Sequence, residues 1–190
     1  VISTGHHRIF AFLVAAFLVS VPVFIQAPLV RLQPWVSLTM TFSWLLGGVY
    51  MLKKPTLKLW GDLAIGFSWT WLAGSIYWGW LRSNPYVHLP VEAIGLPIVI
   101  ILISQNRLKV GSYFYLGSLL GTVITDLYFY WVDLIPYWQQ LMQVPPSDAG
   151  AVLQAALHQI QNPKAAFRAL WLLSLLVAIG LFGMRFPKSH

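Results

Sequence analysis

Two aspartates lie within the apolar stretch Gly111–Trp138. Asp126 and Asp133 are seven residues apart, with Tyr130 between them and Tyr137 beyond them. On a continuous helix these four residues share one face. A lone carboxylate near the middle of a membrane helix costs roughly 2.5–3.5 kcal/mol on insertion scales. We therefore expect Asp126 to face protein, a cofactor or an internal cavity and not lipid.

A histidine and a glutamate form a second polar cluster. His88 and Glu92 are four residues apart, and Pro90, Gly95 and Pro97 accompany them. Because proline lacks an N–H and glycine adds conformational freedom, we expect a broken helix over residues 88–97. Irregular backbone at membrane depth is typical of segments that line a cavity.

These residue types permit two interpretations. In the first, Glu92, Asp126 and Asp133 are the acid and base of an intramembrane reaction, or relay protons together with His88. In the second, Glu92 and Asp133 are solvated at the membrane surface or paired with Arg82, and Asp126 forms a bond to a neighbouring helix. The sequence leaves both interpretations open.

His88 is also a candidate ligand for a pigment, because a histidine can bind the metal of a chlorophyll or haem axially. We name chlorophyll and carotenoid as candidate cofactors, since the chain is rich in aromatic residues that can pack against such molecules. One histidine and one glutamate are only half of a metal site, so we expect no metal held by the protein alone.

The composition indicates an integral membrane protein. Of 190 residues, 58% are hydrophobic and only 9% are charged, against about 25% charged in soluble domains. The net charge of +7 comes from Lys and Arg in short loops between apolar segments, so we read it as a topology signal and expect no nucleic acid partner. There is no cysteine, which excludes thiol catalysis and disulfides.

The apolar segments predict an all-α, polytopic transmembrane helical bundle forming one domain over residues 1–190. A short amphipathic surface helix is expected over residues 147–162, after the break Pro145-Pro146. Because Pro22 and Pro28 lie in the second half of the first span, we expect this span to kink or to end early near Gln26. About six spans are expected, near residues 9–30, 34–52, 60–81, 86–104, 111–138 and 167–184.

The distribution of basic residues predicts the orientation. With six spans, eight Lys and Arg residues fall on the side of the two chain ends and four on the opposite side. By the positive-inside rule both ends are cytoplasmic, and the surface helix is on the other face. The eight are Arg8, Lys53, Lys54, Lys58, Arg107, Lys109, Arg185 and Lys188; the four are Arg31, Arg82, Lys164 and Arg168.

This orientation brings the start of the fourth span and the end of the fifth to the same membrane face. We therefore expect Glu92 to lie within about 15 Å of Asp133, a distance equal to roughly ten residues of helix rise. Such a cluster is the best candidate for a functional site in the chain.

Three blocks of the sequence, WGDLAIGFSWTWLAGSIYWGWLR, HLPVEAIGLP and YLGSLLGTVITDLYFYWVDLIPYWQQLMQV, resemble a family of uncharacterised cyanobacterial integral membrane proteins, defined only as a domain of unknown function. The resemblance runs from Phe17 to about Phe182. It implies a cyanobacterial source, the thylakoid or the plasma membrane as location, and a further apolar segment after this chain ends. It implies no activity.

Together these features favour a non-catalytic accessory or assembly subunit of a photosynthetic membrane complex. Membrane lipid and other membrane-protein subunits are the expected partners, contacted through aromatic and small residues. The alternative is an intramembrane enzyme or transporter that acts on an isoprenoid, a pigment or a quinone, with Glu92, Asp126 and Asp133 as acid and base. A cavity reaching Asp126 would favour the enzyme, and a protein-facing Asp126 would favour the subunit.

Overall fold

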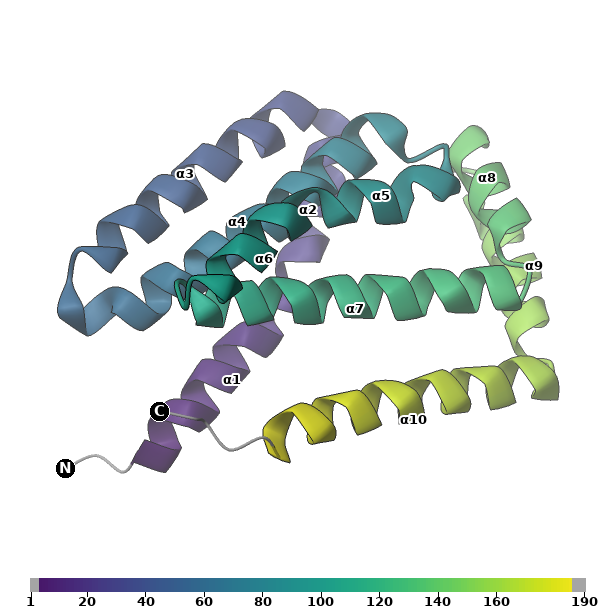
Figure 1. Ribbon diagram of the computed structural model, residues 1–190. Coiled ribbons are helices and arrows are strands. Elements are labelled where there is room, and N and C mark those ends of the chain that lie inside the picture. Colours follow the sequence, from purple (N-terminus) through teal and green to yellow (C-terminus); the bar gives the residue numbers. More distant parts are fainter. Residues whose placement is uncertain (1–3, 186–190) are drawn as a thin grey trace. The chain divides into compact units, whose positions relative to one another are not determined.

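The computed structural model describes residues 4–185, which are helical throughout and include no strand. The fold class predicted from the sequence is confirmed (Figure 1). Lys188, used in the charge count, lies outside the described residues. The α-helices are α1 (Thr4–Ser20), α2 (Pro22–Leu32), α3 (Pro34–Leu52), α4 (Lys58–Ile76), α5 (His88–Glu92), α6 (Leu96–Ser104), α7 (Lys109–Trp131), α8 (Ile135–Gln143), α9 (Ala149–Ile160) and α10 (Pro163–Arg185). Short 3-10 turns occur at η1 (Pro55–Leu57), η3 (Pro85–Val87) and η4 (Ala93–Gly95), and one π-helical turn at η2 (Tyr77–Leu81).

The described residues group into two compact units. The first contains residues 4–82 and 86–119, and the second contains residues 83–85 and 120–185. Helix α7 therefore contributes its first half to one unit and its second half to the other. The single domain expected over residues 1–190 stays a prediction.

Four helical segments among the described residues are long and apolar enough to cross a membrane, and α7 with α8 gives a fifth if that bent pair is one span. Helix α4 coincides with the predicted third span but does not belong to this group. Ten of its nineteen residues are buried in protein, so it does not need the hydropathy of a lipid-facing helix. The expected number of six spans is therefore approximate. The four segments are Ile9–Leu32, Pro34–Leu52, Pro85–Ser104 and Pro163–Phe182.

Prolines set several helix boundaries. Pro22 opens α2 directly after α1 ends, so the kink predicted in the first span is present. The alternative of an early end near Gln26 is not realised, because α2 continues through Pro28 to Leu32. Pro34 is in the first turn of α3, where its missing N–H has no helical partner to lose.

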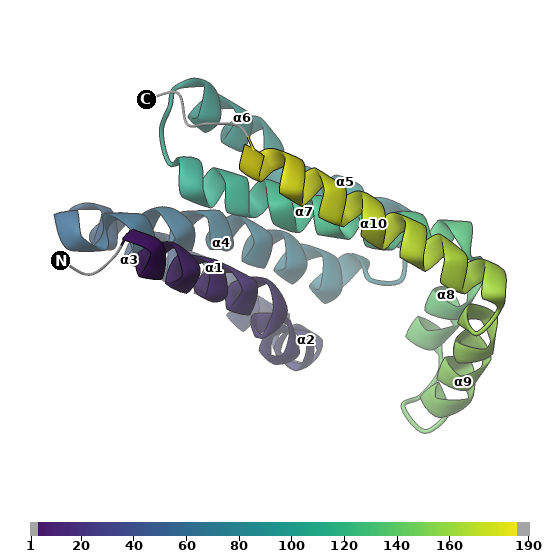
Figure 2. The same ribbon diagram turned by 90° about the horizontal axis from the view of Figure 1, so that it is seen from below.

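Helix α4 is the centre of the first unit. Leu63, Phe67 and Trp71 of α4 pack against Phe114 of α7 in one buried cluster. Helix α1 runs beside α4 (Figure 2), and the rings of Phe10 and Trp60 meet edge to face with their centroids 5.4 Å apart. Aromatic contacts thus join helices that are distant in the sequence.

A buried polar network fixes α2, α3 and α4 to each other. The Gln26 amide nitrogen donates to the Trp71 carbonyl at 2.8 Å and to the Ser75 hydroxyl at 3.0 Å. The hydroxyls of Ser37 and Ser75 are 2.8 Å apart, and the Trp71 indole donates to the Ser37 carbonyl at 2.8 Å. Gln26, Ser37 and Ser75 are all buried. Polar groups surrounded by hydrocarbon must find partners inside the protein, so this network favours one arrangement of the three helices.

Helices α4 and α7 touch through their backbones at the start of α7. The carboxylate of Asp62 accepts hydrogen bonds from the backbone N–H groups of Val110, at 3.1 Å, and Gly111, at 2.8 Å. These N–H groups are among the first of α7, which lack partners within the helix. A Cβ atom on Gly66 would lie 2.1 Å from the Gly111 carbonyl oxygen. Only glycine permits this approach at residue 66.

In the second unit the chain bends sharply after α7. Helix α7 ends at Trp131, and α8 leaves it at 98°, so residues 111–138 are not one straight helix, and they form a single span only if the bent pair crosses the membrane together. The cause is Pro136, in the first turn of α8, whose ring clashes with a helical carbonyl at Val132. The Val132 carbonyl instead accepts a hydrogen bond from the Gln159 amide of α9 at 3.0 Å. Asp133 takes the left-handed conformation, with φ of 56°.

The surface helix predicted over residues 147–162 is present as α9, over Ala149–Ile160. Its buried residue Val152, with Ala156 and Ile160, lies on the side that packs on the rest of the second unit. Leu153 and Leu157 are 54% and 50% exposed. Gln154 and His158 are exposed as well, so the outer face of α9 is mixed, and its place on the membrane surface stays a prediction.

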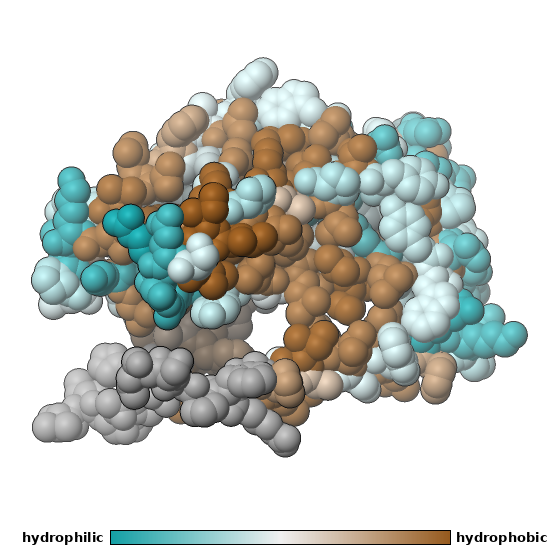
Figure 3. Space-filling model, viewed as in Figure 1, coloured by the Kyte–Doolittle hydropathy of each residue, from teal (hydrophilic) through white to brown (hydrophobic). Residues whose placement is uncertain are grey.

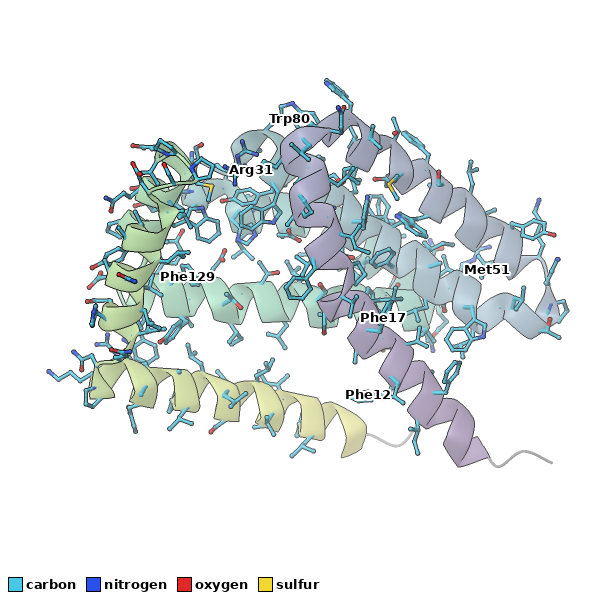
Figure 4. All side chains as sticks on the ribbon, turned by 180° about the vertical axis from the view of Figure 1, so that it is seen from behind. Phe12, Phe17, Arg31, Met51, Trp80 and Phe129 are labelled. Carbon is cyan, nitrogen blue, oxygen red and sulfur yellow. The ribbon has the colours of Figure 1, made fainter. Side chains whose placement is uncertain are left out.

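Much of the remaining surface is apolar. Hydrophobic residues dominate the visible face of the helices, and hydrophilic residues gather at the helix ends (Figure 3). Phe12 and Phe17 project from α1 (Figure 4) and are 71% and 53% exposed. Such a surface is compatible with hydrocarbon and not with water, as expected for an integral membrane protein.

Candidate functional site

The candidate site is the His88–Glu92 pair on α5. The two residues are one helical turn apart, and Nε2 of His88 lies 3.8 Å from Oε1 of Glu92. Their side chains are only 11% and 12% exposed. Two of the predicted site residues therefore lie together in a largely enclosed place in the first unit.

The π-helical turn η2 brings two aromatic rings to His88. The ring of Tyr77, which is fully buried, lies 4.2 Å from the imidazole, centroid to centroid, at 39°. The ring of Trp78 lies 5.8 Å away at 67°. A π-helical turn widens the helix, and such turns are frequent at functional sites. Electron-rich ring faces stabilise an imidazolium more than a neutral imidazole.

Tyr115 of α7 supports the backbone next to Glu92. Its hydroxyl donates to the Glu92 carbonyl at 2.6 Å and accepts from the Gly95 N–H at 3.1 Å. Both groups belong to the region where α5 gives way to the 3-10 turn η4. The helix expected to break over residues 88–97 instead continues to Ser104, with one 3-10 turn at Ala93–Gly95. The helix can continue because the Tyr115 hydroxyl pairs with the Glu92 carbonyl and the Gly95 N–H, the backbone groups affected by the change from α-helix to 3-10 turn.

The 3.8 Å between Nε2 of His88 and Oε1 of Glu92 is too long for a hydrogen bond, so the contact is an electrostatic one and not a shared proton. Enclosure of the two groups strengthens such an interaction. Axial binding of a pigment through Nε2 of His88 would require the pair to open, because that atom faces Glu92. The pigment-ligand role of His88 stays a prediction.

Asp126 belongs to the second unit, in the second half of α7. It is 6% exposed, which confirms that its side chain is turned away from lipid. The polar face predicted on this helix is shorter than expected. It includes Asp126 and Tyr130. Asp133 and Tyr137 come after the end of α7 at Trp131, so they do not continue this helix face.

Asp133 is exposed, in the turn between α7 and α8. Exposure suits the solvated interpretation of this residue better than a role as a buried acid. Glu92 belongs to the first unit and Asp133 to the second, and their approach to within 15 Å stays a prediction. Within the described residues no three His, Asp or Glu side chains gather in a group that could hold a metal ion.

Comparison with known proteins identifies the family. A family described as protein of unknown function (DUF3120) matches residues 15–190. The chain belongs to this DUF3120 family. No curated protein and no solved structure matches it. The resemblance seen in the sequence is thus confirmed at the level of an uncharacterised family.

Sequence reasoning missed Tyr115 as the residue that supports the site of this DUF3120 member. A signal was present, because Tyr115, Thr122 and Asp126 recur at helical spacing on α7. The partner of Tyr115 is a backbone carbonyl more than twenty residues away. No pattern of side chains in the sequence identifies such a partner.

Proposed function

We propose that this protein is an accessory or assembly subunit of a membrane-protein complex, with no catalytic role of its own. The observation that carries the proposal is the burial of Asp126, which is 6% exposed. A carboxyl group enclosed by protein acts as a structural contact, whereas a catalytic acid needs access to a substrate.

The exposed surfaces of the first and last membrane spans in the sequence support the proposal. In the most apolar 18-residue stretch of Ile9–Leu32, only 6% of the residues are buried. In the corresponding stretch of Pro163–Phe182, 11% are buried. Trp35 and Trp80 form an edge-to-face pair with centroids 5.0 Å apart, and their side chains are 67% and 44% exposed. Figure 4 shows Trp80 at the outer surface. Exposed aromatic and small residues allow other membrane helices to pack against the chain.

The setting we propose is the cyanobacterial thylakoid or plasma membrane, and a photosynthetic complex within it, with chlorophyll or carotenoid held at the contacts between subunits. This setting rests on the family resemblance and on the aromatic composition. His88 is the proposed pigment ligand if the pair with Glu92 opens.

The orientation we propose has the N terminus in the cytoplasm. The basic loops after α3 and after α6 lie at the same end of the first unit (Figure 1), and Lys53, Lys54 and Arg107 in them are exposed. Because the chain has no cysteine, single cysteines give a clean reporter. A cysteine at Lys54 should react with a membrane-impermeant maleimide only from the cytoplasmic side, and a cysteine at Gly150 only from the opposite side. The reverse labelling would refute the orientation.

The test of function is the size and composition of the particle extracted in a mild detergent. The tagged protein should migrate on a native gel well above the mass of this chain, 21.5 kDa, plus a micelle, together with subunits of one photosynthetic complex. Deletion of the gene should reduce the yield of that complex. A monomer in the gentlest detergent, with normal complexes in the deletion strain, would refute the proposal.

The second candidate is an intramembrane enzyme or transporter that acts on an isoprenoid, a pigment or a quinone. The observation that favours it is the enclosed His88–Glu92 pair at 3.8 Å beside a π-helical turn. If the protein is a transporter in which Glu92 relays protons, purified protein in liposomes should carry protons when a potassium gradient sets the membrane potential, and Glu92→Gln should abolish the flux. Equal flux with Glu92→Gln would remove the proton-relaying transporter from this candidate.

A further inference from the structure

A pocket lies where α4, α6 and the start of α7 meet, apart from the His88–Glu92 pair. It is partly open and belongs entirely to the first unit, and its empty space of about 180 Å³ includes the space at its open side. The free space inside is that of one small group, such as a hydroxyl or a methyl. Its apolar walls include Ile65, Trp69, Val99 and Leu102, and its polar groups are the side chains of Asp62 and Ser112.

Ser112 is the unusual member of the pocket. The residue is 2% exposed, and its hydroxyl has no hydrogen-bond partner among the described residues. Buried polar groups in native proteins are nearly always paired, because an unpaired one loses its hydration without compensation. The Ser112 hydroxyl therefore indicates a ligand that can hydrogen-bond to it.

Asp62 supplies the complementary group. Its two carboxylate oxygens each accept one backbone N–H of α7, and each keeps lone pairs for a further donor. A group in the pocket would thus find an acceptor in Asp62 and a donor in Ser112. A hydroxyl is the smallest group that both donates and accepts a hydrogen bond.

The surrounding charge selects a neutral ligand over a cation. The loops that lead into α4 and α7 carry Lys54, Lys58, Arg107 and Lys109, all exposed, and Asp62 is the single carboxylate in this region. The positive potential of these side chains and of the α7 N-terminus opposes binding of a cation. The apolar walls are compatible with a hydrocarbon attached to the hydroxyl.

We propose that this pocket binds a neutral hydroxyl group, which donates to Asp62 and accepts from Ser112. The hydroxyl comes either from the end of an apolar alcohol or from a water molecule. Both sources share the same chemistry, and they differ in whether a hydrocarbon attached to the hydroxyl lies outside the pocket at its open side.

The test uses the full chain in phosphatidylcholine nanodiscs, because this lipid has no hydroxyl group. The probe is a photoreactive aliphatic diazirine alcohol, and the matched control is its methyl ether, which cannot donate a hydrogen bond. Crosslinked peptides are identified by mass spectrometry, and thermal unfolding is measured in parallel. Ser112→Ala removes the donor, and Thr41→Val removes the other unpaired buried hydroxyl, which is on α3 and does not line the pocket.

If an alcohol is the ligand, the probe labels peptides 62–69 or 99–112, the ether does not, and Ser112→Ala weakens labelling roughly fivefold, as loss of one hydrogen bond does. If water is the ligand, alcohol-specific labelling is absent and Ser112→Ala lowers the unfolding temperature, whereas Thr41→Val does not. The proposal is overturned if labelling by the alcohol is unchanged in Ser112→Ala. It is equally overturned if labelling is absent and Ser112→Ala unfolds at the same or a higher temperature than the unmodified protein.

Discussion

The substitution Gly66→Ala should separate α4 from α7. A Cβ atom at residue 66 would lie 2.1 Å from the Gly111 carbonyl oxygen and 2.5 Å from its Cα atom. Both are backbone atoms that cannot rotate away. Ordinary contact distances require the two helices to move apart by more than about 1 Å.

This displacement has a cost that the structure allows us to estimate. Overpacking costs about 1–3 kcal/mol. The same movement stretches the bonds from Asp62 to the Val110 and Gly111 N–H groups, now 3.1 and 2.8 Å, beyond useful length. Hydrogen bonds to a charged group contribute about 1.5–3 kcal/mol each. Asp62 is half-buried, so we take the lower values and expect a total loss of about 3 kcal/mol or more.

The assay is thermal unfolding of the purified protein in detergent, followed by circular dichroism. For a chain of this length about 3 kcal/mol corresponds to a decrease of roughly 6–12 °C. The matched control is Gly47→Ala in α3, where a Cβ atom would meet nothing within 4 Å. Gly47→Ala should leave the transition unchanged or raise it slightly. Equal unfolding temperatures for Gly66→Ala and Gly47→Ala would refute the close contact of α4 and α7.

Three further substitutions test individual contacts. Tyr115→Phe removes the hydroxyl that pairs with the Glu92 carbonyl and the Gly95 N–H. It should lower the free energy of unfolding by about 1–3 kcal/mol and speed amide hydrogen exchange at Gly95. Unchanged exchange at Gly95 would contradict this prediction. Gln159→Leu removes the hydrogen-bond donor of the Val132 carbonyl at the end of α7. The free energy of chemical unfolding should fall by about 1–2 kcal/mol. An unchanged free energy would show that the bend needs no such donor. Asp126→Asn changes a buried carboxyl and Asp148→Asn an exposed one, so only the first should reduce the yield of the complex; equal and negligible effects would contradict a role for Asp126 in assembly.

The prediction of the fold was successful where local sequence decides the structure. The kink expected in the first span is present at Pro22, and the polar interval after Pro146 forms the helix α9. The bend inside the fifth predicted span was not foreseen, because hydropathy continues through residues 111–138 while the helix ends at Trp131. Pro136 was the available signal, since an internal proline removes a helical hydrogen bond.

The candidate site was predictable in its residues and not in its partners. The spacing of His88 and Glu92 places them one turn apart on any helix, and the structure has them 3.8 Å apart. The contact with Tyr77 depends on a π-helical turn, which no pattern in the sequence announced. Asp126 is likewise buried as expected from the cost of a carboxyl group in lipid.

The sequence by itself determined that the chain is helical, apolar enough for a membrane and too poor in charge for a soluble protein, because hydropathy and helical period are properties of neighbouring residues. Only the tertiary structure decided that α4 is the central helix and that Asp62 binds the start of α7. It also decided that Tyr115 holds the backbone next to Glu92 and that Ser112, whose hydroxyl has no hydrogen-bond partner among the described residues, lines a pocket. These contacts join residues 20–50 positions apart in the sequence, and their formation depends on how whole helices pack against each other.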